Sequence, residues 1–167
     1  MRSRNGRAPT PSDRAQVWLP APLAYAAGFG LGWAVHRLWP GPMLKGPAAR
    51  GLGALLLAGG GALAAWSLWE FRRAGTSPDP ARPSRRLVTE GPYRFSRHPQ
   101  YLALTATYAG ASLWLGAAAP LALLPAVLYV TARGVVEPEE AYLARRFGAE
   151  YEAWRKRVPR WCGLRSR

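Results

Sequence analysis

The stretch GPYRFSRHPQY, residues 91–101, marks the point where a basic segment gives way to an apolar one. It opens a run of 34 residues, from Pro99 to Ala132, that contains no charged residue. A second charged cluster, EPEE at residues 137–140, follows the end of that run. If the run folds back on itself as a hairpin, the two clusters meet at one face of a membrane. We place the candidate site at that meeting point.

Two earlier segments, Val17–Val35 and Gly51–Trp69, also lack charged residues over 19 positions each. As helices they would be about 28 Å long, close to the roughly 30 Å of a bilayer's hydrocarbon core. The 34-residue run would reach about 51 Å, which favours two crossings with a turn near residues 116–120. The sequence therefore predicts an all-α polytopic membrane protein with about four transmembrane helices, near residues 17–39, 51–70, 99–115 and 119–135.

The distribution of positive charge predicts the orientation. The net charge is +14, and 20 of the 23 Lys and Arg residues fall in the first 16 residues, in the loop 71–98 or from Arg133 onward. Four crossings put these three regions on one side, which the positive-inside tendency identifies as cytoplasmic. We therefore expect an inner (cytoplasmic) membrane protein with both termini in the cytoplasm. A nucleic-acid-binding protein would instead need a basic face on a soluble fold.

The length predicts one membrane domain, residues 17–167, after a disordered basic tail at residues 1–16. The first apolar segment is too long for a signal peptide, and no small-residue cleavage site follows it, so we interpret it as a retained helix. Gly28 and Gly32 are four residues apart, which on a membrane helix favours close helix packing over a nucleotide-binding loop. The same interpretation applies to the three glycines at 59–61.

A C-terminal amphipathic helix is expected over residues 138–157, on the cytoplasmic side. Large apolar residues recur there at intervals of four, four, three and four, which places them on one helix face: Leu143, Phe147, Tyr151, Trp154 and Val158. The loop 71–98 ends in apolar and aromatic residues, so we expect it to be ordered and functional rather than a linker.

The two charged clusters carry complementary chemistry. Pro99 suits the first position of a helix, whose exposed N–H groups attract an anion. Arg97 adds a cation and His98 a ring nitrogen, while the glutamates of the second cluster supply negative charge. Tyr93 and Tyr101 offer aromatic faces. Such a site suits a small zwitterion with a flat ring, such as S-adenosylmethionine. The same residues could also serve only as markers and anchors of the membrane boundary.

The motif RHPQY at 97–101, followed by EEAYLARRFGAEY at 139–151 and by Val158-Pro159, resembles the isoprenylcysteine carboxyl methyltransferase family. That family is a branch of the integral-membrane phospholipid methyltransferases. The resemblance implies a membrane methyltransferase that uses S-adenosyl-L-methionine on its cytoplasmic side. It further implies that Arg97 and Glu140 form an ion pair between the two segments. The cofactor-binding residues that it implies are Leu87, Val88, Tyr93, His98, Pro99, Gln100, Tyr101, Glu139 and Glu140.

The resemblance leaves the acceptor open. Eukaryotic members carry an Arg one helical turn before the glutamate pair, where this chain has Val135, with Arg133 two residues earlier. The candidate catalytic residues are therefore Arg97, His98 and Arg133. We expect a lipid-like or small hydrophobic acceptor that enters from the bilayer, and neither a metal nor a nucleic acid as partner. Two alternatives are a relative of the membrane NADPH-dependent sterol-type reductases and a non-catalytic membrane scaffold.

Overall fold

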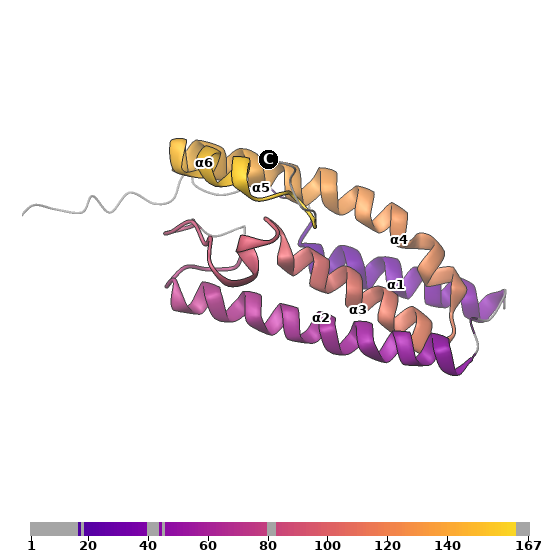
Figure 1. Ribbon diagram of the computed structural model, residues 1–167. Coiled ribbons are helices and arrows are strands. Elements are labelled where there is room, and N and C mark those ends of the chain that lie inside the picture. The colour runs from indigo at the N-terminus through magenta and orange to yellow at the C-terminus, as the bar shows by residue number, and fades with distance from the viewer. Residues whose placement is uncertain (1–16, 18, 40–43, 45, 80–82, 163–167) are drawn as a thin grey trace, which may run out of the picture.

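The computed structural model describes residues 17, 19–39, 44, 46–79 and 83–162, and these form an all-α structure (Figure 1). No strand occurs among them, so the predicted fold class is confirmed at this level. The predicted tail, residues 1–16, lies outside the described residues. The helical elements are α1 (Ala21–Leu38), α2 (Pro47–Arg73), η2 (Gly91–Arg94), α3 (Pro99–Leu115), α4 (Ala118–Thr131), η3 (Ala132–Val136), α5 (Glu137–Phe147) and α6 (Ala149–Arg157).

The four longest helices lie side by side along a common direction (Figure 1). The most extensive packing joins α2 to α3, and α1 to α4. The α3–α4 turn lies at one end of the bundle. At the other end, the loop after α2 lies close to α5 and α6. The hairpin predicted from the uncharged run therefore brings both charged clusters to the same end.

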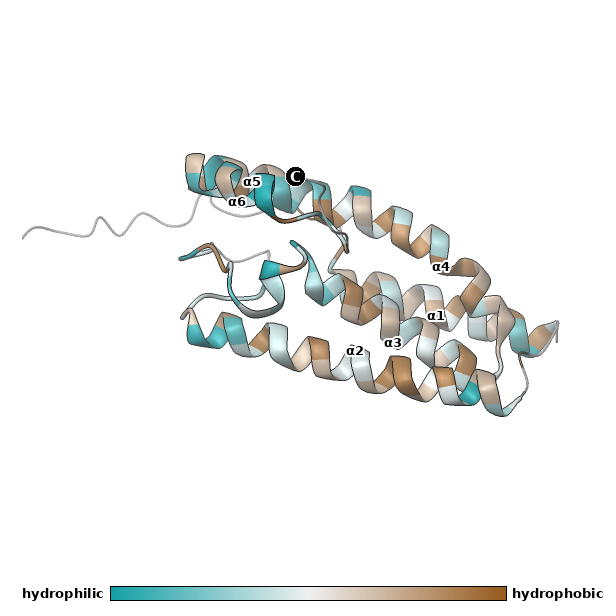
Figure 2. Ribbon diagram, viewed as in Figure 1, coloured by the Kyte–Doolittle hydropathy of each residue, from teal (hydrophilic) through white to brown (hydrophobic). Residues whose placement is uncertain are grey.

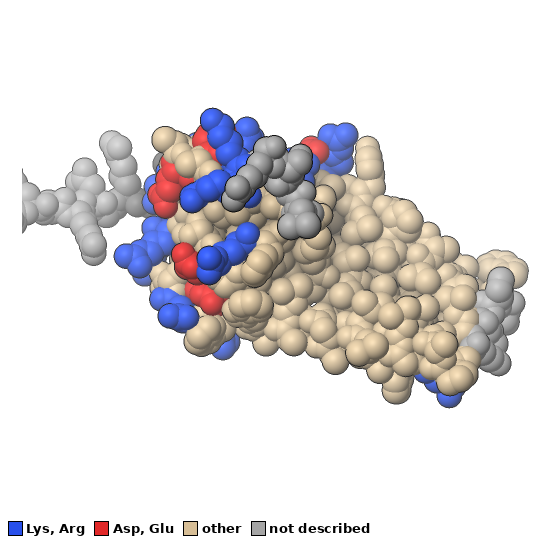
Figure 3. Space-filling model, in the orientation of Figure 1, with Lys and Arg blue, Asp and Glu red and all other residues tan. Residues whose placement is uncertain are grey.

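The face of the bundle seen in Figure 3 is uncharged along most of its length, and charged side chains gather mainly at the α5–α6 end. Hydrophobic residues recur along the four long helices (Figure 2). Large apolar side chains such as Leu31, Leu55 and Tyr129 point outward and are more than half exposed. By length and composition, two continuous helices could cross a bilayer: Pro47–Arg73, and the combined helix Ala118–Phe147. The helices α1 and α3 fall outside that set, so four crossings stay a prediction.

Glycines let the helices approach closely, as the sequence analysis predicted for several of them. A Cβ atom on Gly32 would collide with the backbone of Pro120 in α4, and one on Gly53 would lie 2.7 Å from the backbone nitrogen of Trp114. Gly60 similarly faces α3, whereas Gly59 and Gly61 face open space. The packing interpretation is therefore confirmed for Gly32 and Gly60, and also for Gly28, where a Cβ would collide with the Val127 side chain of α4. It does not extend to every glycine of the 59–61 triplet.

Two adjacent glycines provide a matched test of this packing. We expect Gly60→Ala to lower the stability by about 1–3 kcal/mol, because its Cβ would lie 2.6 Å from Thr107 Oγ1 and 2.9 Å from the carbonyl of Ala103. Gly61→Ala should be neutral or stabilising, because nothing lies within 4 Å and alanine favours the helix. Thermal unfolding of both variants in detergent checks the difference. Equal unfolding midpoints would contradict the packing argument.

The predicted amphipathic helix 138–157 is wrong as a single helix. Gly148, with a φ of 53°, separates α5 from α6. The break arises because a glycine readily adopts this left-handed backbone conformation, which stops a helix. The predicted apolar face survives the break, since its members from both helices pack on one cluster. The predicted fourth crossing, 119–135, also differs: it continues through η3 into α5 without ending.

Candidate active site

The N-terminus of α3 is held against the chain that follows α6. The Arg97 amide donates to the carbonyl of Pro159 over 3.0 Å, and the Ser96 hydroxyl lies 3.3 Å from the carbonyl of Arg160. Ser96 Oγ also accepts a hydrogen bond from the His98 amide at 3.1 Å. These bonds fix the residues just before Pro99, the first residue of α3. The C-terminal segment thus closes over the start of the third helix.

Glu140 is the centre of a buried ionic network. Its carboxylate lies 3.0 Å from His98 Nε2 and 2.8 Å from an Arg97 nitrogen. Arg160 reaches the same carboxylate with two nitrogens, at 2.6 and 3.2 Å. The side chain of His98 is only 4% exposed and that of Glu140 only 9%. Because so little water reaches the pair, the carboxylate and its donors depend on one another for solvation.

Glu139 and Tyr101 form a second link between the same two segments. The Tyr101 hydroxyl donates to Glu139 Oε2 over 2.7 Å. The His98 ring stacks on Tyr101 with a centroid separation of 5.6 Å, and it lies 5.8 Å from the ring of Trp161. His98 Nδ1 is 3.9 Å from Glu139 Oε2. His98 is thus enclosed by the two glutamates and two aromatic rings, in a fixed orientation.

The π-helical turn η3 sets the direction in which the glutamates point. The Glu137 amide donates to the carbonyl of Ala132, five residues earlier. A π turn accommodates one more residue than an α turn, so it rotates all that follows by about 100° relative to an uninterrupted helix. Glu139 and Glu140 lie directly after it. No pattern in the sequence predicts this turn. It sets how the side chains of α5 are rotated about the helix axis relative to those of α4.

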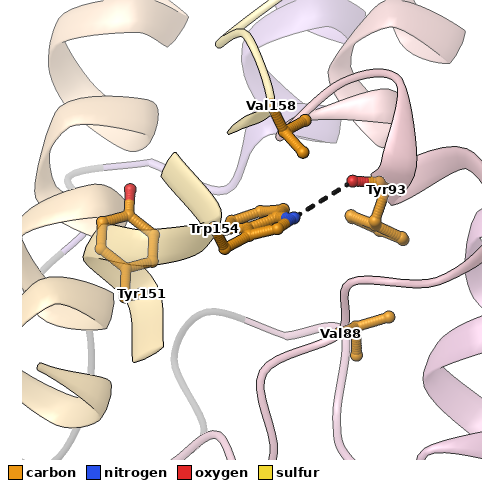
Figure 4. Close-up of a cluster of buried hydrophobic side chains, with 5 residues drawn as sticks. All are labelled: Val88, Tyr93, Tyr151, Trp154 and Val158. Carbon is orange, nitrogen blue, oxygen red and sulfur yellow. Dashed lines mark hydrogen bonds between the residues drawn. The ribbon is translucent and has the colours of Figure 1, made fainter. Parts of the chain in front are cut away.

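A cluster of buried apolar side chains covers the site on the side of the loop (Figure 4). The Trp154 indole lies between α6 and the loop, and its Nε1 donates to the Tyr93 carbonyl over 3.3 Å (Figure 4). Burial, followed by the charge of Glu140, raises the pKa of Tyr151. The members of the cluster are Val88, Tyr93, Tyr151, Trp154 and Val158. The cluster joins the loop to α6, so the loop is packed on the bundle.

Two hollows flank the glutamate–tyrosine link. The first, which we call the cofactor hollow, is bounded by the loop, η2 and α5, and its lining includes Leu87, Val88, Tyr93, Arg97 and Glu139. The second, the apolar hollow, has a volume of about 400 Å³ and lies between α1, α2 and α3. Its lining includes Ala21, Leu68, Gln100, Tyr101 and Leu104. Pro78 and Asp79 of the loop line both hollows, which therefore adjoin.

Comparison with known proteins identifies the family. The phospholipid methyltransferase family matches residues 48–150, which include α2, α3, α4 and both charged clusters. The chain belongs to this family. A protein-S-isoprenylcysteine O-methyltransferase from Schizosaccharomyces pombe is 38% identical over 73 residues, which are 44% of this chain and 31% of that protein. The resemblance stated from the motifs is confirmed. No solved structure matches significantly.

Buried polar atoms without a hydrogen-bond partner indicate whether a cofactor of this methyltransferase family could fit the site. The Tyr93 hydroxyl and Gln100 Nε2 are buried and have no hydrogen-bond partner among the described residues. Burial, followed by the charge of Glu139, raises the pKa of Tyr93, so its hydroxyl stays protonated. An unpaired buried polar group costs about 1–3 kcal/mol, which a ligand with polar edges would offset. Tyr93 lines the cofactor hollow and Gln100 lines the apolar hollow, so each hollow offers a polar group to a ligand. The cofactor hollow itself has a volume of about 40 Å³, against about 400 Å³ for the apolar hollow.

The structure brings together most of the residues that the sequence analysis named as candidate site residues. His98, Tyr101, Glu139 and Glu140 are in mutual contact, and Arg97 pairs with Glu140 as the resemblance implied. Gln100 lies in the apolar hollow, and Pro99 begins α3 and is buried.

Arg133 lies at the surface. Its side chain is 60% exposed and pairs with Glu137 at 3.0 Å, four residues along the same helix. In this structure Arg133 therefore makes none of the glutamate–histidine contacts, and its catalytic role stays a prediction. Val135, by contrast, is 1% exposed and packs in a cluster with Tyr101. The position one turn before the glutamate pair is thus occupied by a core side chain that lines neither hollow.

Sequence reasoning missed Arg160 and Trp161. Hydrogen bonding to Glu140 raises the pKa of Arg160, which keeps the guanidinium charged. Trp161 lies beside the ring of His98. The available signal was the Val158-Pro159 element of the motif, which directly precedes both residues. The residues after α6 turn back to the site, and the periodicity of apolar residues does not predict the direction of such a turn. The motif was therefore not enough to identify Arg160 and Trp161 as site residues. Among the described residues, no three His, Cys, Asp or Glu side chains gather to hold a metal ion.

Proposed function

We propose that this protein is an integral-membrane methyltransferase that uses S-adenosyl-L-methionine and methylates a lipid-like or small hydrophobic acceptor. The observation that supports this most directly is the junction of the two hollows beside Tyr101 and Glu139. One hollow has charged and aromatic walls, and the other is apolar. A methyl donor and an apolar acceptor need such adjoining compartments, because the two reacting groups must come into contact.

In this proposal the cofactor hollow holds the methyl donor and widens on binding, because its volume of about 40 Å³ is smaller than the roughly 300 Å³ or more of ordinary ligand sites. When bound, S-adenosylmethionine supplies a methyl group that its sulfonium activates. Arg97 lines the hollow and suits an anionic group, while Glu139 suits a cationic or hydroxyl group. Tyr93 and Tyr101 supply aromatic faces, and Leu87 and Val88 supply backbone and apolar contacts. His98, held by Glu140, positions Tyr101 by stacking rather than by acting as a base.

The apolar hollow would receive the acceptor. Its volume of about 400 Å³ falls within the range of small-molecule sites. Three helices of the bundle line it, so an apolar acceptor could reach it laterally from the bilayer. With donor and acceptor held together and water excluded, methyl transfer depends mainly on orientation.

We also propose the topology predicted from the sequence, with four crossings and both termini in the cytoplasm. The charged end of the molecule, with α5, α6 and the loop, would then face the cytoplasm (Figure 3). This places the cofactor hollow where a water-soluble cofactor can enter, and the apolar hollow at the level of the membrane.

Thermal stabilisation by two nucleotides tests the function. We expect S-adenosylhomocysteine to raise the unfolding midpoint of the detergent-purified full chain, because a ligand that binds only the native state stabilises it. At 100 times its dissociation constant the gain is about 2.7 kcal/mol. NADPH at the same concentration should cause no shift. A shift with NADPH alone would instead support the reductase alternative, and a folded protein that responds to neither would support the scaffold alternative.

A further inference from the structure

One hydrogen bond joins the two hollows of the site. Tyr101 lines the apolar hollow, and Glu139 lines the cofactor hollow. The Tyr101 hydroxyl donates to Glu139 Oε2 over 2.7 Å. A tyrosine hydroxyl that donates one hydrogen bond can still accept another. The bond therefore connects a group held in the apolar hollow, through one hydroxyl, to a carboxylate at the cofactor hollow.

We propose that Tyr101 and Glu139 form a proton relay that removes a proton from the methyl acceptor. The acceptor is accordingly a protonated nucleophile, a thiol or a hydroxyl, attached to an apolar body. This inference rests on the methyltransferase function proposed above. A thiol or hydroxyl must lose its proton in the course of methylation, whereas a carboxylate is already ionised at neutral pH and needs no base.

The proton transfer balances the methyl transfer. While the acceptor atom forms a bond to the methyl carbon, the bond from that carbon to the sulfonium breaks, and its electron pair stays on the departing sulfur. The acceptor's proton passes to the Tyr101 hydroxyl oxygen, which gives its own proton to Glu139 Oε2. The Glu139 side chain is 23% exposed, so water can later take the proton from it.

Other titratable groups lie near this pair. The His98 ring stacks on Tyr101, but its Nδ1 lies 3.9 Å from Glu139 Oε2, which is beyond hydrogen-bond distance. His98 Nε2 contacts Glu140, and His98 lines neither hollow. Asp79 lines both hollows and is therefore the competing proton acceptor. The remaining titratable or charged neighbours among the described residues are Tyr25, Tyr93 and Arg97.

The test compares two thiols of similar size as acceptors for the full chain in detergent. Phenylmethanethiol is protonated at neutral pH and needs a base, whereas thiophenol is largely ionised and needs none. Phenylacetate serves as the carboxylate probe. Methyl transfer from S-adenosylmethionine is measured against pH, at a cofactor concentration that saturates each protein. Titration with S-adenosylhomocysteine establishes this concentration.

Three variants and a matched control are compared with the wild type. Tyr101→Phe removes the hydroxyl of the relay but keeps the ring, and Glu139→Gln removes the final proton acceptor. Asp79→Asn removes the competing carboxylate. The control, Tyr108→Phe, removes another hydroxyl of α3, which donates to the carbonyl of Pro120 over 2.8 Å and lines neither hollow.

We expect Tyr101→Phe to lower the rate with phenylmethanethiol by about 100-fold or more at neutral pH, which is the usual contribution of general acid–base catalysis. The remaining rate should rise about tenfold for each pH unit, because only the thiolate then reacts. The rate with thiophenol should fall by less than about tenfold. Glu139→Gln should show the same pH dependence. Tyr108→Phe and Asp79→Asn should instead affect both thiols equally.

Several results would overturn the proposal. They are a wild-type pH dependence in Tyr101→Phe, a steep pH dependence in Asp79→Asn alone, and methylation of phenylacetate but of neither thiol. A protein that binds S-adenosylhomocysteine yet methylates none of the three probes would also overturn the acceptor class, while the proposed function would stand. Absence of S-adenosylhomocysteine binding would overturn the proposed function itself, and the relay with it.

Discussion

Replacing Glu140 with alanine should destabilise the protein by about 3 kcal/mol or more and abolish S-adenosylhomocysteine binding. The carboxylate is the common partner of Arg97, His98 and Arg160. Removing one member of a buried ion pair leaves the opposite charge without compensation, which is costlier than the pair itself is favourable. Here two cations and a histidine lose their acceptor in one substitution. Thermal unfolding in detergent and ligand titration measure the two effects.

Two further variants serve as comparisons: one keeps the shape of the Glu140 side chain without its charge, and the other removes an exposed glutamate. Glu140→Gln keeps the size and one acceptor oxygen, so its loss of stability should be smaller than that of the alanine variant. Glu152→Ala removes an exposed glutamate whose contact with Arg155 is on the surface, and should cost less than 1 kcal/mol. If Glu140→Ala unfolds at the same temperature as Glu152→Ala, Glu140 is not the centre of a buried network.

The meeting of the two clusters was the part of the site that the sequence could predict. As a helix the uncharged run would be about 51 Å long, well beyond the roughly 30 Å of the hydrocarbon core, so it is expected to fold back and bring its two charged ends together. The contacts of His98 with Glu140 and of Tyr101 with Glu139 confirm this reasoning. The start of α3 at Pro99 was also predicted, because proline is favoured in the first turn of a helix.

Other features depend on geometry that a sequence pattern does not carry. The period of apolar residues continues across Gly148, so it predicts one helix where the backbone makes a break. The π turn before α5 changes the rotation of the helix between Arg133 and the glutamate pair, and Arg133 is exposed and pairs with Glu137. Arg160 reaches Glu140 because the chain reverses after α6, and the direction of such a return is set by packing on Trp154 and Tyr93.

Glu139→Ala should lower the affinity for S-adenosylhomocysteine by about 100-fold while leaving the protein folded. Glu139 lines the cofactor hollow, and its carboxylate is the acceptor for the Tyr101 hydroxyl. Unlike Glu140, it has no guanidinium partner within ion-pair distance in the described structure, and its side chain is 23% exposed. Its charge is therefore available to a ligand rather than committed to the fold. A hydrogen bond to a charged group contributes about 1.5–3 kcal/mol, which corresponds to an affinity change of this order.

A nearby glutamate, Glu137, supplies the control for this prediction. Glu137 lies two residues earlier in α5, is exposed and pairs with the exposed Arg133, so Glu137→Ala should bind S-adenosylhomocysteine like the wild type. Titration of the three proteins, with unfolding midpoints to verify folding, makes the comparison. Wild-type affinity in a folded Glu139→Ala protein would show that the cofactor does not contact this carboxylate. Loss in Glu139→Ala alone would locate the cofactor beside Tyr101, at the boundary with the apolar hollow, where an acceptor from the membrane can meet it.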